Sequence, residues 1–104
     1  MATAPKLEYG HITHDPDVRA GKACIAGTRI AVVDVALALE RGLTPEEIRT
    51  HFSSRALTLA EVHAALAYHF GHPEELADYV RRSQRALARV ETSRVAYLGR
   101  TAGR

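Results

Sequence analysis

The sequence is poor in the residues on which several common functions depend. Its 104 residues include one cysteine and no tryptophan, and they contain no apolar run of about 18 residues, the length that crosses a bilayer. A single cysteine excludes an internal disulfide and any CxxC or Cys/His finger spacing. The N-terminal residues lack the basic-then-apolar pattern of a signal peptide. We therefore expect a cytoplasmic protein that has no membrane contact.

The charge is small overall but unevenly distributed. The net charge is +2, yet residues 1–75 hold seven Lys/Arg against ten Asp/Glu, whereas residues 76–104 hold seven arginines against two acids. A mildly acidic body with an arginine-rich end predicts two parts, 1–75 and 76–104, of which the second binds something anionic. The anionic partner could be nucleic acid or the acidic pocket of another protein. A solvated helix that carries charge for solubility remains the alternative.

Start and stop signals predict a mostly α-helical chain. A nearly continuous apolar run begins at Val32 and ends before Gly42, which is typical of a helix at the centre of a core. Thr44 and Thr58 are each followed three residues later by glutamate, the pattern of a capping box, and Pro45 suits the first helical position. These boxes predict a short helix that extends to Phe52 and a longer one over 58–70, joined by a connection of four to five residues.

Three such helices predict a trihelical helix-turn-helix domain whose third helix is the recognition helix. Residues 9–13 and 25–33 ahead of it are interpreted as short strands or an extended arm. The apolar stripe expected along the third helix is Leu59, Val62, Leu66 and Phe70. A final amphipathic helix should follow Pro73, with Leu76, Val80, Leu87 and Val90 along its stripe, and should fray before residue 99.

No pattern typical of an enzyme is present. The glycines between residues 21 and 27 do not form a phosphate-binding loop, and Cys24 lies among apolar neighbours that would leave its thiol inert. His63, His69 and His72 do not share one helical face, so they do not predict a metal site. The paired glutamates open helices, where the helix dipole favours them. We therefore expect no catalysis, no metal and no cofactor.

Double-stranded DNA is a plausible partner for the helix-turn-helix. The exposed face of the third helix has no Arg, Asn or Gln with which to read bases, so the flanking cations would bind phosphates. The DNA-binding candidates are Arg19, Lys22, Arg29, Arg49, Arg55, Thr58 and His63. An all-helical packing module that binds no DNA is the alternative.

Three segments together resemble a known family. Residues 12–30 (ITHDPDVRAGKACIAGTRI), 42–48 (GLTPEEI) and 57–68 (LTLAEVHAALAY) look like the domain of unknown function 433 family, small prokaryotic proteins regarded as VapB-like antitoxins. The resemblance covers about residues 11–78. Ala20 stands where the family often has glycine and Ala23 where it usually has proline, and the connection after Phe52 is a residue or two longer than in the family. The resemblance implies a helix-turn-helix fold, dimerisation and a neighbouring toxin that has a PIN-like ribonuclease fold.

On this basis the chain is interpreted as the antitoxin of a type II toxin-antitoxin pair that also binds its own promoter DNA. The expected toxin-binding residues are Leu76, Tyr79, Val80, Arg81, Arg82, Arg85, Leu87, Arg89, Val90 and Arg94. Gly27 is expected to adopt a positive φ and Thr28 to bond the local backbone, in a turn that leads into the first buried helix. A stand-alone DNA-binding regulator and a helical adaptor that binds no nucleic acid are the two alternatives.

Overall fold

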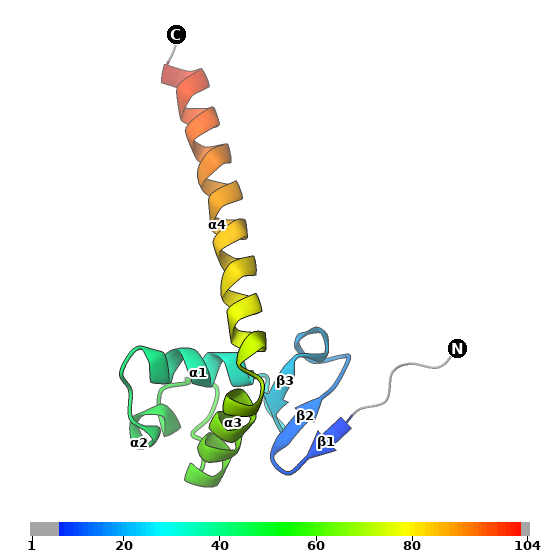
Figure 1. Ribbon diagram of the computed structural model, residues 1–104. Coiled ribbons are helices and arrows are strands. Elements are labelled where there is room, and N and C mark those ends of the chain that lie inside the picture. Colours follow the sequence, from blue (N-terminus) through cyan, green and yellow to red (C-terminus); the bar gives the residue numbers. More distant parts are fainter. Residues whose placement is uncertain (1–6, 103–104) are drawn as a thin grey trace, which may run out of the picture. The chain divides into compact units, whose positions relative to one another are not determined.

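The computed structural model describes residues 7–102, with side chains from residue 10 to residue 99. The chain divides into two compact units, Met1–Pro73 and Glu74–Arg104. The described residues are mostly helical, as the sequence predicts, and Figure 1 labels their helices: α1 (Val32–Glu40), α2 (Pro45–Arg49), α3 (Leu59–Gly71) and α4 (Pro73–Ala102). We describe the first unit and then α4, each by itself.

Three short strands precede the helices. They form an antiparallel sheet in the order β1 (Leu7–Tyr9), β2 (Ile12–His14) and β3 (Ala23–Ile25). Gly10, with φ +62°, makes the tight turn that pairs Tyr9 with Ile12. The expectation of continuous extended segments over 9–13 and 25–33 is therefore wrong in its boundaries. A turn interrupts the first segment, and the second leaves the sheet at Ile25 and is already helical at Val32.

The turn after β3 has the geometry that its sequence predicts. Gly27 has φ +74°, a conformation that glycine adopts at little cost. The Thr28 hydroxyl donates to the carbonyl of Ile25 at 2.8 Å and accepts from the amide of Ile30 at 3.0 Å. One hydroxyl thereby bridges the peptide groups on either side of the turn, and the chain continues from this turn into α1.

Helix α1 lies at the centre of the first unit. Val35 and Ala36 are fully buried, and α1 packs against α3, α2 and β3. Ala31 precedes the helix and has no side-chain acceptor, so the carboxylate of Asp34 accepts from the Ala31 amide at 2.9 Å instead. The helix ends at Glu40, and Gly42, with φ +96°, completes the C-terminal turn. The expected central helix is confirmed.

Both capping boxes are present, but α2 is shorter than expected. Thr44 and Thr58 each accept a hydrogen bond from the amide of the glutamate three residues later. Helix α2 ends at Arg49 and does not reach Phe52, so the connection to α3 spans residues 50–58. The Arg49 carbonyl accepts from the Leu57 amide at 2.8 Å, and the Arg49 Nε donates to the Leu57 carbonyl at 3.0 Å. This double link closes the longer connection and seats the fully buried Leu57 in the core.

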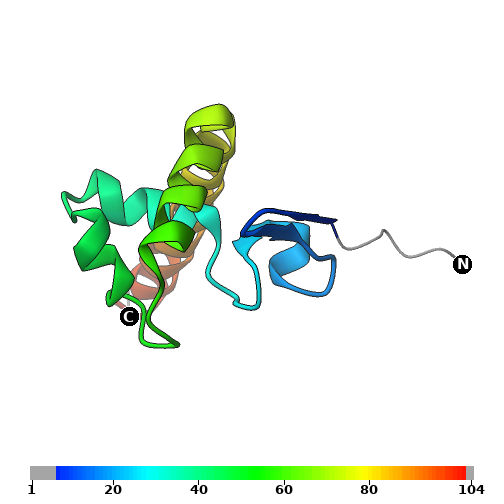
Figure 2. The same cartoon turned by 90° about the horizontal axis from the view of Figure 1, so that it is seen from below.

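The buried side of α3 differs from the predicted stripe. Val62 and Leu66 are buried as expected, together with Ala65. Leu59 and Phe70 are exposed, Phe70 at 66%, whereas His69 is buried in the last turn. The sheet lies beside the group formed by α1, α2 and α3 (Figure 2), and β2 and β3 pack against α3.

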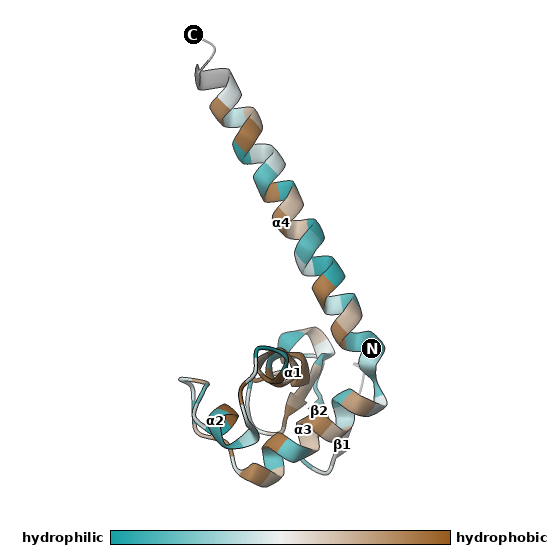
Figure 3. Ribbon diagram, turned by 60° about the vertical axis from the view of Figure 1, so that its left-hand side comes forward, coloured by the Kyte–Doolittle hydropathy of each residue, from teal (hydrophilic) through white to brown (hydrophobic). Residues whose placement is uncertain are grey.

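Helix α4 is a single amphipathic helix in which brown apolar segments alternate with teal polar ones (Figure 3). Leu87, Val90 and Tyr97 are exposed at 68%, 65% and 60%. The helix continues through Gly99 to Ala102, so the expected fraying before residue 99 is wrong. No helix within the described part of the chain is both long enough and apolar enough to cross a membrane.

Candidate functional site

Three of the arginines predicted to bind DNA hold the fold together. Arg19 Nη1 donates to the Arg29 carbonyl and to Asp34 Oδ2, both at 3.0 Å, so it ties the turn before β3 to the first turn of α1. Arg49 closes the connection to α3, as described above. Arg55 forms a two-pronged ion pair with Glu61. Each guanidinium would have to leave these partners, at least in part, to bind a phosphate.

Glu61 is the buried acid of this group, although the sequence placed it on the exposed face of α3. Its exposed fraction is 9%, and its carboxylate accepts from the Thr58 amide as well as from Arg55. Burial acts to raise the pKa of Glu61, but the hydrogen bonds from Arg55 and Thr58 outweigh burial and hold the pKa below its ordinary value. Glu61 therefore joins the cap of α3 to the connection before it, while the Thr58 side chain is occupied by the same cap.

The remaining DNA-binding candidates are accessible. Arg29 and His63 are exposed, and Lys22 is half-buried. The other exposed residues of α3 are mostly small or apolar, among them Leu59, Ala60, Ala67 and Phe70. None of the residues in α3 is Arg, Asn or Gln, the side chains that make bidentate contacts to bases. The chemistry of this face suits a non-specific or apolar contact better than base reading.

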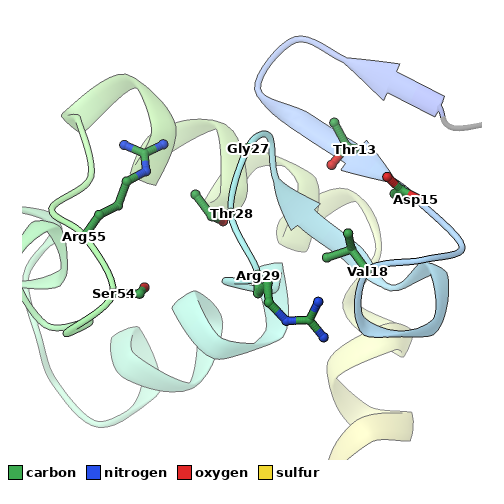
Figure 4. A pocket seen from close by; sticks show the side chains of 8 residues that line it. All are labelled: Thr13, Asp15, Val18, Gly27, Thr28, Arg29, Ser54 and Arg55. Carbon is green, nitrogen blue, oxygen red and sulfur yellow. The ribbon is translucent and has the colours of Figure 1, made fainter.

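An open cleft of about 410 Å³ lies where the turn at Gly27 faces the connection between α2 and α3. Its lining residues are Thr13, Asp15, Val18, Gly27, Thr28, Arg29, Ser54 and Arg55, shown in Figure 4. Arg29 and Arg55 point away from each other in this view. They do not converge on a common point as a phosphate clamp would require. Asp15, Val18 and Ser54 could not be predicted as neighbours from the sequence, because only the tertiary fold brings residues 15 and 54 together.

Cys24 and the histidines add no chemistry that the sequence overlooked. Cys24 is 1% exposed, and burial is the main reason that the pKa of its thiol lies above its ordinary value. The predicted burial of Cys24 is thus confirmed. Tyr68 accepts or donates one hydrogen bond with His14 at 3.0 Å and stacks on the ring of His72. Within the described side chains no group of three metal-binding residues comes together.

Helix α4 carries its charge and its apolar residues on different faces. Leu76, Val80, Leu87 and Val90 recur at helical spacing, and Arg81, Arg82, Arg85 and Arg89 lie on the other side of the helix. We call these two faces the stripe and the arginine face. Asp78 pairs with Arg82 at 3.0 Å and with Arg81 at 3.6 Å. Arg85 and Arg89 are exposed and have no acidic partner among the described residues.

Arg94 lies on the stripe and not on the arginine face. It is four residues after Val90 and three before Tyr97, which places all three on one side of the helix. Its guanidinium pairs with Glu91 at 3.0 Å. One charged residue therefore interrupts the stripe.

Comparison with known proteins found one matching family and one similar crystal structure. A crystal structure of a DUF433 member protein from Anabaena variabilis ATCC 29413 superposes with a TM-score of 0.61 and 26% identity, over 69% of each chain. No curated protein matches the sequence. The family described as "Protein of unknown function (DUF433)" matches residues 12–69, the segment that forms β2, β3 and the helices α1 to α3. That match spans more than half of the chain, and the protein belongs to the DUF433 family.

Proposed function

We propose that the protein is the antitoxin of a type II toxin-antitoxin pair and that α4 neutralises a PIN-like ribonuclease. The observation that carries the proposal is the arginine face, on which Arg85 and Arg89 are exposed and have no acidic partner among the described residues. A helix that keeps cations free along one side is suited to an acidic concave surface. The resemblance of residues 12–68 to VapB-like antitoxins supports the same reading.

The mechanism follows from the chemistry of the partner. Nucleases of the PIN type hold Mg²⁺ with a cluster of Asp and Glu side chains, so their active sites are strongly negative when no metal is bound. A guanidinium forms two parallel hydrogen bonds with a carboxylate and can occupy the place of the metal or of the RNA phosphate. Arg85 and Arg89 are separated by one helical turn and can enter such a cluster together.

Promoter binding is the second part of the proposal, and it rests on the first unit. Arg29 and His63 are exposed, and Lys22 is half-buried, so these side chains could contact phosphates without breaking the ion pairs of Arg19 and Arg55. Because α3 offers no base-reading side chain, we expect DNA binding to depend steeply on salt and weakly on sequence.

The test is co-expression of the tagged protein with its genomic neighbour, followed by pull-down and a ribonuclease assay. The Arg85→Glu/Arg89→Glu variant should lose both the complex and the inhibition, because it turns two attractive contacts into repulsive ones. The matched control is Arg29→Glu/Arg41→Glu, which changes the net charge equally but alters exposed residues of the first unit. The control should keep the nuclease inhibited.

Inhibition that survives Arg85→Glu/Arg89→Glu would show that the arginine face is not the neutralising element. A protein that forms no complex with the neighbour but shifts its own promoter would be a stand-alone regulator.

The exposed Leu59, Ala67 and Phe70 on α3 favour the remaining candidate, a helical adaptor. That reading predicts a protein complex and no DNA shift even at low salt.

A further inference from the structure

The stripe of α4 has the spacing of a coiled-coil seam. Its members occur at alternating intervals of four and three residues, in the order Leu76, Val80, Ser83, Leu87, Val90, Arg94 and Tyr97. Tyr79 and Leu98 widen the apolar side of this seam. Leu87, Val90, Tyr97 and Leu98 are all exposed, so the centre and the C-terminal half of the seam are uncovered. A regular seam over six intervals favours another helix as its partner over an irregular groove.

We propose that the partner is α4 of a second copy of this chain, packed antiparallel. In an antiparallel pair the residue numbers of one helix rise while those of the opposing helix fall. We assign the register that maps the six seam members from Val80 to Tyr97 onto each other. That register places Leu87 against Val90 of the partner and Val80 against Tyr97 of the partner. Apolar residues then meet apolar residues at the centre and on both sides of it.

The two polar members of the seam select this orientation. In the antiparallel register Ser83 opposes Arg94 of the partner, so the smaller side chain leaves room for the larger one. At the edge of the seam Gln84 lies across from Glu91 of the partner, where an amide can donate to a carboxylate. A parallel pair would instead oppose Arg94 with Arg94 of the partner, and like charges in one layer are destabilising.

The contact is large enough for a stable dimer and leaves the arginine face outside. At roughly 100 Å² for each exposed apolar side chain and half of that for each half-buried one, two stripes bury about 1,100 Å², which exceeds the roughly 1,000 Å² expected of a specific interface. Arg85 and Arg89 project from the opposite side and remain open to an acidic partner. The proposal assigns the stripe to a second copy, whereas the sequence predicted that the same residues bind the toxin. Formation of this dimer requires no toxin.

Sedimentation equilibrium of the full-length protein alone is the first experiment. The wild type should be a dimer at micromolar concentration, and Leu87→Glu should be a monomer, because its charge would lie at the centre of the seam. The matched control, Ala88→Glu, places the same charge on the adjacent exposed position off the stripe and should stay dimeric. Circular dichroism establishes that both variants keep their helix content. A monomeric wild type, or a dimer that survives Leu87→Glu, would overturn the proposal.

Disulfide formation tests the orientation. Native Cys24 is buried, so an introduced cysteine is the reactive one. A Ser83→Cys chain mixed with an Arg94→Cys chain that carries a different tag should form a mixed disulfide under mild oxidation, and Ser83→Cys alone should not cross-link. A Ser83→Cys homodimer linked through residue 83 would indicate a parallel pair and refute the antiparallel register. Self-association and nuclease inhibition are measured in separate assays. Failure of the dimer proposal can therefore be distinguished from failure of the antitoxin proposal.

Discussion

Replacement of Ala20 by glycine should stabilise the protein. Arg19, Ala20 and Gly21 have φ of 51°, 58° and 80°, a left-handed turn in which only the third residue is glycine. An L-residue in this conformation costs about 1–2 kcal/mol because its Cβ approaches the following carbonyl oxygen. Ala20 is exposed, so removal of its methyl group loses little buried surface.

The expected gain follows from two opposing terms. Glycine removes the steric cost but makes the unfolded chain more flexible, which costs about 0.4–1 kcal/mol. The net stabilisation is about 0.5–1 kcal/mol, and for a domain of this size it raises Tm by about 2–8 °C. Differential scanning calorimetry and urea denaturation should both resolve a change of this magnitude.

The control is the same substitution at a helical alanine. Ala67 is exposed in the middle of α3, where glycine should cost about 1 kcal/mol and lower Tm by several degrees. The two variants delete the same methyl group and should shift Tm in opposite directions. If Ala20→Gly lowers Tm as Ala67→Gly does, the left-handed turn stores no strain and the argument from its φ values is refuted.

Three further predictions follow from individual contacts. Glu61→Gln should cost about 1–3 kcal/mol in urea denaturation at neutral pH, because the Arg55 guanidinium loses its charged acceptor. The pKa of Glu61 in the folded protein lies below its ordinary value of 4.5, so its contribution to the free energy of unfolding is fully present above pH 4.5 and is lost as the pH falls through the folded pKa. The stability curves of Glu61→Gln and of the wild type should therefore converge in acid, and parallel curves would refute this. Arg94→Leu should tighten self-association in sedimentation, because it removes the layer that selects the orientation. A chain that carries both Ser83→Cys and Arg94→Leu should then form a disulfide with its own copy through residue 83 under mild oxidation; an unchanged dimer constant would count against the seam. Cys24 should react with a thiol reagent only after urea unfolding, and rapid labelling of the native protein would contradict its burial.

Local signals in the sequence were sufficient for most of the fold. Thr44 and Thr58 mark helix starts because each cap is formed between the threonine and a glutamate three residues later. Gly42 marks a helix end because the positive φ that ends the helix depends on the glycine itself. Such interactions need no knowledge of the tertiary structure. The end of α2 was mispredicted because it is set by Arg49 and Leu57, whose double link depends on where the buried leucine lies in the core.

The candidate site could not be predicted in the same way. Charge alone suggested Arg19, Arg49 and Arg55 as phosphate ligands, yet each has a specific acceptor in the folded chain. Composition cannot distinguish a cation that is free from one that is paired, because pairing is decided by residues up to fifteen positions away. The burial of Glu61 was missed for the same reason. Its neighbours on α3 resemble an exposed face, and its burial is compensated by hydrogen bonds from Arg55 and from the Thr58 amide.

Helix α4 shows the opposite case, since its two faces follow from spacing alone. The arginine face and the stripe lie on opposite sides of one helix, so a substitution on one face leaves the other chemically unchanged. This separation makes the two proposals independent: Arg85→Glu/Arg89→Glu should abolish nuclease inhibition in a protein that remains dimeric, and Leu87→Glu should abolish the dimer while the arginine face persists. If Leu87→Glu also abolishes inhibition, the toxin recognises the paired helices and not a single one. An antiparallel pair presents two arginine faces on opposite sides, so that outcome would further predict two toxin molecules for each antitoxin dimer.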